Sequence, residues 1–135
     1  MATIKKFEDL EVWQLARNLA KEIFEMYTHS DLFLKDYKLK DQINGSSGSV
    51  MDNIAEGFER SERNEFINFL SIAKGSAGEV QSQLYRALDR NYIERDKFDD
   101  LYNKAAQICQ KAGALINYLN KSEHKGNKFK DRTVL

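Results

Sequence analysis

The sequence predicts an all-α chain folded as an antiparallel, up-down-up-down four-helix bundle. Its 135 residues include no proline, which removes the strongest obstacle to long helices. Four segments carry apolar residues three and four positions apart, which is the spacing of one helix face. No segment shows a convincing two-residue alternation, so no sheet is indicated. Four helices joined by short connections favour an antiparallel bundle.

The first helix is expected from about Leu10 to Tyr27, with Asp9 as its N-cap. Its apolar face is wider than the roughly 100° stripe that a single core needs. The extra width predicts a second partner surface. The two edges of this face are Val12, Ala16, Leu19, Ile23 and Met26 on one side and Trp13, Ala20, Phe24 and Tyr27 on the other.

The second helix is expected from about Lys38 to Glu56, with Gly57 as its C-terminal cap. The preceding connection, Thr28 to Asp36, should pack its apolar residues over the end of the bundle. Those residues are Leu32, Phe33 and Leu34.

Within the second helix, the segment from Gly45 to Ser49 has the composition of a flexible linker. A helix is favoured because apolar and small residues keep the three-and-four spacing through it. Small residues there would let a neighbouring helix pack closely, so replacing Gly48 with leucine is expected to destabilise the chain by about 1–3 kcal/mol. The positions that keep the spacing are Leu39, Ile43, Ser47, Val50, Ile54 and Phe58.

The third helix is expected to begin at an N-cap, Ser61, and to end near Arg90 with Asn91 as a left-handed cap. The fourth is expected to follow Glu94 and to run to about Asn120. Residues 1–120 therefore form the predicted bundle, and residues 121–135 form a basic tail without periodicity. A solvated, disordered tail is favoured over a nucleic-acid-binding arm.

The charge balance excludes a strong overall attraction to phosphate, because 21 basic residues face 21 acidic ones. The single cysteine, Cys109, excludes an intramolecular disulfide and is interpreted as a small core residue rather than a reactive thiol. No apolar run approaches the roughly 20 residues that span a bilayer, and the N-terminus lacks a signal-peptide core. We expect a cytoplasmic protein without a membrane partner.

Enzyme signatures are lacking, so we expect no catalytic residues, no cofactor and no metal. The two histidines, His29 and His124, do not combine with Cys109 at a recognisable metal-ligand spacing. The Gly45-Ser-Ser-Gly48 segment lacks the Gly-Lys-Ser/Thr of a phosphate loop.

Polar residues interrupt two apolar faces. Asn53 and Glu56 stand three apart in the second helix, and Ser76 and Glu79 stand three apart in the third. In antiparallel neighbours these pairs could share a hydrogen-bond network, since a buried carboxylate needs donors. A network that fixes helix register is favoured over a ligand or proton site.

A second candidate set combines basic and aromatic residues that could contact nucleic acid. Near the turn between the third and fourth helices, basic and aromatic side chains could stack on bases, although aromatic residues at a bundle end usually cap the core. The basic tail could add phosphate contacts. The candidate residues are Arg86, Arg90, Tyr92, Arg95, Lys121, Lys125, Lys128, Lys130 and Arg132.

Several motifs resemble the four-helix-bundle proteins encoded in bacterial ribosomal-RNA intervening sequences. The resemblance runs in order over about Phe7 to Leu119, and the most specific piece is the Asn-Ile-Ala-Glu-Gly element. The pieces are Phe7–Trp13, Gln42-Ile43, Asn53–Gly57, Glu65-Phe66 with Phe69-Leu70, and Gly75-Ser76 with Glu79.

The resemblance implies an up-down-up-down bundle that assembles as a homopentamer. A related protein is the accessory protein of diversity-generating retroelements, which resembles a basic pentameric barrel that holds a reverse transcriptase and nucleic acid. Family members often carry arginines after the Gln-Ile pair, where this sequence has Asn44 and Gly45. Many also carry proline where this one reads Ser49–Asn53. Loss of the basic pair argues against nucleic-acid binding.

The sequence therefore favours a non-enzymatic, self-assembling protein that acts as a scaffold or adaptor, with itself as the main partner. The alternative is a nucleic-acid-binding accessory protein that contacts RNA, DNA or a nucleic-acid enzyme.

Overall fold

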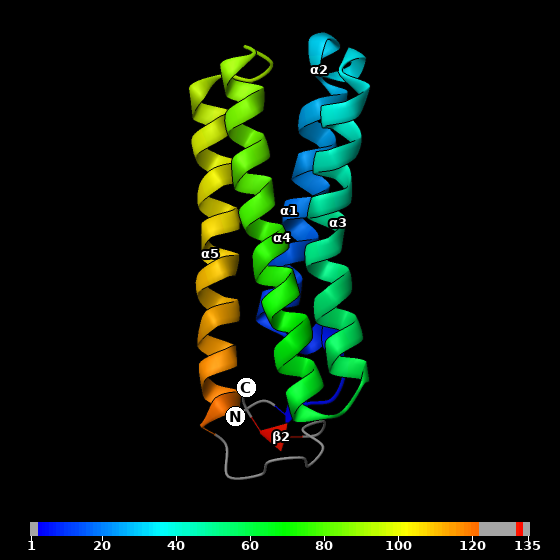
Figure 1. Ribbon diagram of the computed structural model, residues 1–135, viewed down its shortest axis with the longest axis vertical. Helices are drawn as coiled ribbons and strands as arrows, with labels where there is room; N and C mark the ends of the chain where they lie inside the picture. Colours follow the sequence, from blue (N-terminus) through cyan, green and yellow to red (C-terminus); the bar gives the residue numbers. More distant parts are fainter. Residues whose placement is uncertain (1–2, 122–131, 134–135) are drawn as a thin grey trace.

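Four long helices account for most of the chain. The computed structural model describes residues 3–121 and 132–133. Figure 1 shows the long helices side by side, with the chain reversing direction from each one to the next. Contacts join α1 to α3 and α5, and join α4 to the same two helices. The helices are α1 (Glu11–Thr28), α3 (Tyr37–Glu59), α4 (Arg63–Asp89) and α5 (Arg95–Asn120).

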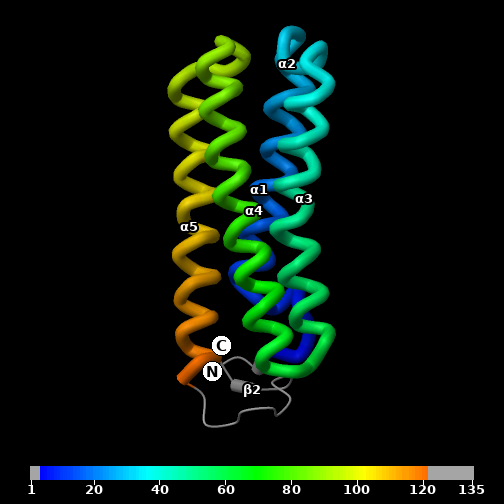
Figure 2. Tube along the Cα trace, viewed as in Figure 1, coloured from blue at the N-terminus to red at the C-terminus, as the bar shows by residue number. Residues whose placement is uncertain are grey.

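Two short helices and a strand pair complete the described part of the chain. The prediction of an all-helical chain is confirmed except for an antiparallel pair of two-residue strands, β1 (Thr3–Ile4) and β2 (Arg132–Thr133). This pair lies at the end of the bundle where α3 meets α4 (Figure 1), a turn that the Cα trace in Figure 2 also shows. Two residues are too few to show a two-residue alternation, so the strands could not be predicted from the hydrophobic pattern. The short helices are η1 (Phe7–Asp9) and α2 (Asp31–Lys35).

The start of α1 differs from the prediction. Leu10 is the N-cap, and Asp9 belongs to η1. The Asp9 carboxylate accepts hydrogen bonds from the backbone N–H groups of Lys5 and Lys6, at 3.1 and 3.3 Å. Asp9 therefore closes the preceding turn and leaves the α1 terminus without a side-chain cap.

The connection between α1 and α3 packs over the end of the bundle, and Phe33 is the one fully buried residue of its three predicted apolar contacts. Phe33 in α2 is fully buried, while Leu34 is half-buried. Leu32 is 58% exposed, so the prediction that it packs inward is wrong. The Ser30 hydroxyl accepts a hydrogen bond from Phe33 N and donates one to the Tyr92 carbonyl, which fixes α2 against the α4–α5 turn. Only one face of this five-residue helix can meet the core.

The α3 helix continues through Gly45 to Ser49, as the spacing predicts. The expected close neighbour at Gly48 is wrong for the single chain, because a Cβ at Gly48 would meet no described atom within 4 Å. The expected overpacking by leucine at this position therefore has no basis inside the chain.

The end of α3 is later than predicted. Gly57 lies inside the helix and not at its C-cap, which is Arg60. An added Cβ at Gly57 would lie 2.6 Å from Phe69 Cβ. Gly57 is thus a point where α3 and α4 approach closely, and the absence of a side chain permits that approach.

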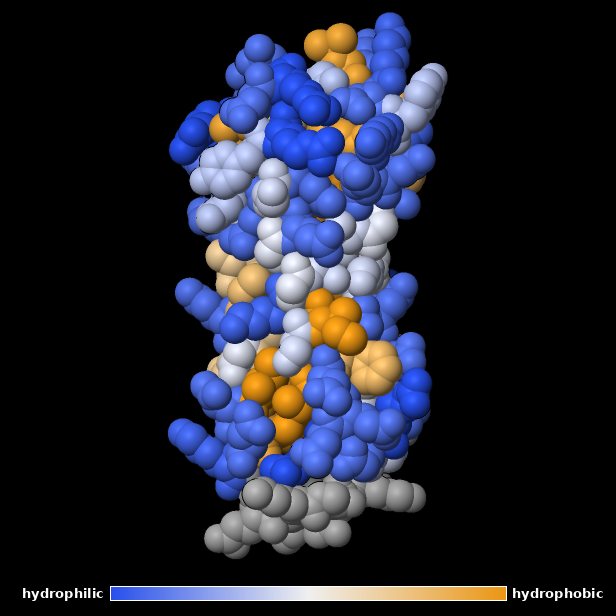
Figure 3. All heavy atoms as spheres, viewed as in Figure 1, coloured by the Kyte–Doolittle hydropathy of each residue, from blue (hydrophilic) through white to orange (hydrophobic). Residues whose placement is uncertain are grey.

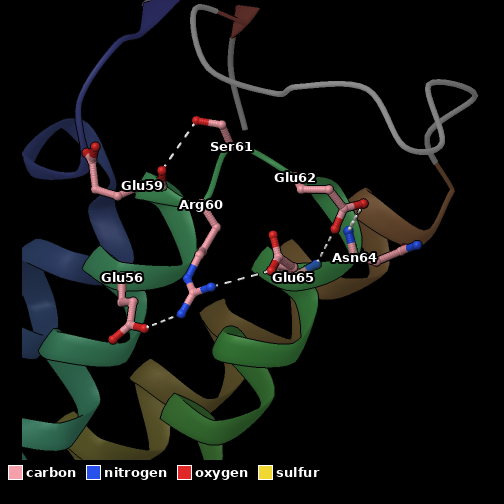
Figure 4. Close-up of polar contacts among 7 residues, drawn as sticks. All are labelled: Glu56, Glu59, Arg60, Ser61, Glu62, Asn64 and Glu65. Atoms are coloured by element: carbon pink, nitrogen blue, oxygen red, sulfur yellow. Dashed lines mark hydrogen bonds and ion pairs between the residues drawn. The ribbon is translucent and has the colours of Figure 1, made fainter.

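The α3–α4 turn also changes the predicted cap. Ser61 has a φ of 59°, in the left-handed region, and the N-cap of α4 is Glu62. The Glu62 carboxylate accepts hydrogen bonds from the N–H groups of Asn64 and Glu65, at 3.2 and 2.8 Å (Figure 4). At the other end of α4, Asn91 has a φ of 60°, which confirms the predicted left-handed residue.

The core runs the length of the four helices and is almost entirely aliphatic and aromatic. One buried cation enters it at the end that carries the strands: the Arg63 guanidinium donates to the Leu119 carbonyl at the end of α5. Among the described helices, none combines the length and apolarity needed to cross a bilayer.

Candidate functional site

A polar layer joins α3 to α4 near their middle. The Ser49 and Ser76 hydroxyl oxygens are 3.0 Å apart. The Asn53 side-chain amide donates to both the carbonyl and the hydroxyl of Ser49, at 2.8 Å each. The structure therefore joins two of the four predicted network residues, Asn53 and Ser76, through a serine that the prediction did not include.

The two predicted carboxylates lie outside this layer, so that part of the predicted network is wrong. Glu56 is exposed and forms an ion pair with Arg60 at 2.9 Å, and Arg60 also reaches Glu65 at 3.6 Å (Figure 4). Glu79 is exposed on α4. A step of three residues turns a helix by about 300°, so each carboxylate lies roughly 60° from its partner, far enough to reach water.

A second polar pair extends the layer and was missed by the sequence reading. The Gln83 amide donates to the Ser46 hydroxyl at 3.0 Å, and both side chains are buried. Each falls at a core position of its helix, so the spacing of the buried positions could have identified both residues. Among the described residues, no donor reaches Gln83 Oε1. A cleft of about 330 Å³ opens above this pair, lined by Gln42, Ser46, Glu79, Ser82, Gln83 and Arg86.

Paired amides and hydroxyls between two helices fix their relative height, since a shifted register would leave buried groups without partners. The α3–α4 layer has this arrangement. Its geometry supports the interpretation as a structural network.

The four basic and aromatic candidates near the α4–α5 turn all contact other groups of the chain. Arg86 donates to Gln42 Oε1 at 2.8 Å. The Arg95 side chain pairs with a neighbouring carboxylate on α5 at 3.2 Å and lies over an aromatic ring. Arg90 Nη1 and the Tyr92 hydroxyl both donate to Asp36 Oδ2, at 2.7 and 2.8 Å.

The tail candidates are only partly covered by the structure. Lys121 is exposed at the end of α5. Arg132 lies in β2 by its backbone, paired with Ile4. Lys125, Lys128 and Lys130 lie outside the described residues. The structure thus brings together Arg90 and Tyr92, and it places the described tail residues Lys121 and Arg132 at the opposite end of the bundle from that turn (Figure 1).

Asp36 connects this turn to α3. Its other oxygen accepts the Leu39 N–H at 3.2 Å, as the N-cap of α3. The hydrogen bond from Tyr92 is the main cause that holds the pKa of Asp36 below its usual range, followed by the Leu39 N–H, and Arg90 contributes. The same bond raises the pKa of Tyr92.

Acid is expected to reduce the stability of the wild-type chain more steeply than that of an Asp36→Asn variant. A carboxyl whose pKa is lowered on folding gives stability that is complete above its unfolded pKa of about 3.9 and is lost as the pH falls through the folded value. Asparagine still caps a helix but does not titrate. Urea unfolding at a series of pH values between about 5 and 2 measures both slopes. Equal slopes would contradict this role of Asp36.

Other reactive groups show no catalytic grouping within the described residues. No set of three His, Cys, Asp or Glu side chains there could hold a metal ion. Cys109 is half-buried, and burial raises the pKa of its thiol. A cleft of about 320 Å³ lies between the end of α1 and the α4–α5 turn, and its lining includes Met26, His29, Ile93 and Lys97. His29 Nδ1 there lies 2.6 Å from the Glu25 carbonyl oxygen.

Two comparisons with known proteins bear on these features. A model of the family described as 23S rRNA-intervening sequence protein matches residues 8–114. A crystal structure of a protein of unknown function, from the S23 ribosomal protein family of Bacteroides thetaiotaomicron VPI-5482, is similar with a TM-score of 0.70 and 26% sequence identity. The match covers 78% of this chain and 97% of that one. A search of curated proteins gave no match.

The family match covers α1, α3 and α4 in full, most of η1 and of α5, and the polar layer between α3 and α4. The chain belongs to the 23S rRNA-intervening sequence protein family.

Proposed function

We propose that this chain is a non-enzymatic, antiparallel four-helix bundle that assembles with copies of itself into a ring and acts as a scaffold or adaptor. The observation that carries the proposal is a pair of surfaces on α1 and α3 that the chain leaves uncovered. Phe24 on α1 is 54% exposed, and the open sides of Gly45 and Gly48 on α3 meet no described atom within 4 Å. Aromatic surface exposed on a helix is typical of contacts between chains. A helix face with glycines allows the backbone of a neighbouring helix to approach closely.

The face formed by α4 and α5 supports assembly less well. Figure 3 shows its apolar residues in separate groups, divided by charged residues and by a pale band of small ones. Ile72 and Tyr118 are about half exposed, but they lie on different helices. Contacts between chains usually centre on one continuous apolar area. The family resemblance alone supports the number five for the ring.

A nucleic-acid role, of the type of the retroelement accessory protein, is the alternative. The described arginines of the α4–α5 turn already have acceptors in the chain, so a phosphate would have to displace Asp36 or Gln42. Nucleic-acid binding through lysines and arginines would weaken steeply with added salt, whereas assembly through apolar surface would not. No feature of the described residues favours this alternative over self-assembly.

Self-assembly is expected to appear directly in solution. Light scattering coupled to size-exclusion chromatography at micromolar concentration should give a mass several times the 15.7 kDa of one chain, and about five times that mass for a pentamer. Because each subunit of a closed ring uses the same two surfaces, one species should dominate. A mass of 15.7 kDa would contradict both the ring and the scaffold role.

A further inference from the structure

The outer face of α3 carries a hollow that packing among the described residues does not require. Gly45 and Gly48 lie in the helix interior, where each glycine costs about 1 kcal/mol relative to alanine. An added Cβ at either position would meet no described atom within 4 Å, so intrachain packing does not require them. They leave a hollow of about 540 Å³, whose lining is Asn44, Gly45, Gly48, Ser49, Asp52, Asn53 and Glu56.

The outer edge of α1 has the opposite shape. Phe24 projects from it, half exposed, and packs edge-on against Tyr27 with ring centroids 5.5 Å apart. About three helical turns earlier along the same edge, Trp13 is half-buried, and the Arg17 guanidinium lies 5.9 Å from its ring centroid. Lys21 is exposed between these aromatics. This edge is bulky and basic.

The charges of the two surfaces are complementary, and those of Arg17, Lys21 and Asp52 are not compensated by an ion pair among the described residues. The hollow carries the carboxylate of Asp52 and, at its edge, that of Glu56, which is already paired with Arg60. A basic edge and an acidic hollow attract each other and suppress other pairings.

The spacing of the two surfaces also matches. Phe24 lies seven residues after Arg17, and Gly45 lies seven residues before Asp52. If α1 of one copy runs antiparallel to α3 of the next, placing Phe24 opposite Gly45 therefore places Arg17 opposite Asp52. The same register places Lys21 opposite Gly48. The large side chain meets the hollow and the two opposite charges meet each other.

The heights of the two surfaces along the bundle axis are compatible with a closed ring. Within one chain, the bond from the Tyr27 hydroxyl to Asn44 Oδ1, at 3.2 Å, marks residues of α1 and α3 at equal height. Relative to that bond, Phe24 and Gly45 differ in height by only about two residues, or about 3 Å at 1.5 Å per residue. A contact between copies at nearly equal height produces little rise from one copy to the next. Such a head-to-tail contact can close into a ring instead of continuing as a filament.

We propose that the outer edge of α1, with Phe24, Lys21 and Arg17, docks antiparallel into the α3 hollow at Gly45, Gly48 and Asp52 of a second copy of this chain. This inference rests on the proposed self-assembly and names its interface. In a ring this contact is heterologous: each copy gives its α1 edge to one neighbour and its α3 hollow to the other.

Charge reversal tests the register of the full-length protein. Arg17→Glu and Asp52→Lys each place like charges opposite one another, and each should raise the concentration at which half the chains assemble by at least about tenfold. The double variant, Arg17→Glu with Asp52→Lys, should recover most of the assembly because the pair is restored in reverse. Light scattering over a concentration series measures all four proteins. Two single variants that assemble like the wild type would overturn the register.

Filling the hollow tests the shape. Gly48→Leu should abolish assembly while circular dichroism still shows a folded helical chain, because an added Cβ there would meet no described atom within 4 Å. The matched control is Gly75→Leu on α4, where an added Cβ also meets nothing within 4 Å; it should leave the assembly mass unchanged.

The outcomes separate this inference from the proposed function. A wild type that is monomeric at all concentrations overturns both. A wild type that assembles, with Gly48→Leu unchanged, overturns the α1–α3 interface alone. A wild type that assembles, with Gly75→Leu disrupted in place of Gly48→Leu, places the contact on α4 and also overturns it.

Discussion

Replacing Phe33 with alanine is expected to lower the free energy of unfolding by about 3–5 kcal/mol, the usual loss for a fully buried phenylalanine. Phe33 is the apolar anchor of α2, and its ring packs against Tyr27 and Tyr92 with centroids 5.9 and 5.2 Å away. Its removal would leave a cavity where α1, α2 and the α4–α5 turn meet. Urea unfolding of both proteins at one chain concentration measures the difference.

Leu32→Ala provides the matched control for that experiment. It removes an apolar side chain from the adjacent position of the same short helix, but this side chain is 58% exposed. Its loss should change the free energy of unfolding by no more than about 0.5 kcal/mol. Similar losses for the two variants would show that α2 does not anchor the bundle end through Phe33.

Adding a single methyl group at Gly57 is expected to lower the free energy of unfolding by about 2–3 kcal/mol, despite the better helix propensity of alanine. The new Cβ would lie 2.6 Å from Phe69 Cβ and 3.1 Å from the Phe66 ring. A Cβ cannot move without its helix, so α3 and α4 would have to separate. The same denaturation experiment measures the loss.

Gly75→Ala is the control for Gly57→Ala. An alanine at Gly75 meets no described atom within 4 Å, so it should raise stability by up to about 1 kcal/mol through helix propensity. If both glycine variants raised stability equally, the close approach of α3 and α4 at Gly57 would be wrong.

The helices themselves could be predicted from the sequence because apolar spacing reports burial directly. The positions that define the predicted faces, such as Ile43, Val50 and Ile54, are fully buried. The same spacing correctly predicted that Gly45 to Ser49 is helical despite its linker-like composition. Tertiary packing of the apolar face outweighs the low propensity of two glycines.

Helix ends were predicted less well, because a cap depends on the path of the chain before it. Asp9 and Ser61 are good capping residues by type, yet Asp9 turns back to Lys5 and Lys6, and Ser61 adopts a positive φ. The caps then fall one residue later, at Leu10 and Glu62. Composition favours a capping residue but does not fix the loop geometry that uses it.

The candidate site was half predictable for a similar reason. Asn53 and Ser76 lie on the flanks where α3 and α4 meet, while Glu56 and Glu79 lie further round and reach solvent. A single sequence shows which residues share one side of a helix, but not which flank a neighbour covers. Ser46 and Gln83 were not predicted, because a pattern that counts apolar residues does not register polar residues at core positions.

Native mass spectrometry of the full-length protein, purified without nuclease, tests the central claim most directly because it reports subunit number and any bound mass together. The account predicts one dominant species at a whole multiple of 15.7 kDa, a pentamer by the family resemblance, with no additional mass from RNA or DNA. A spectrum dominated by the 15.7 kDa chain, or by one chain carrying nucleic acid, would contradict it.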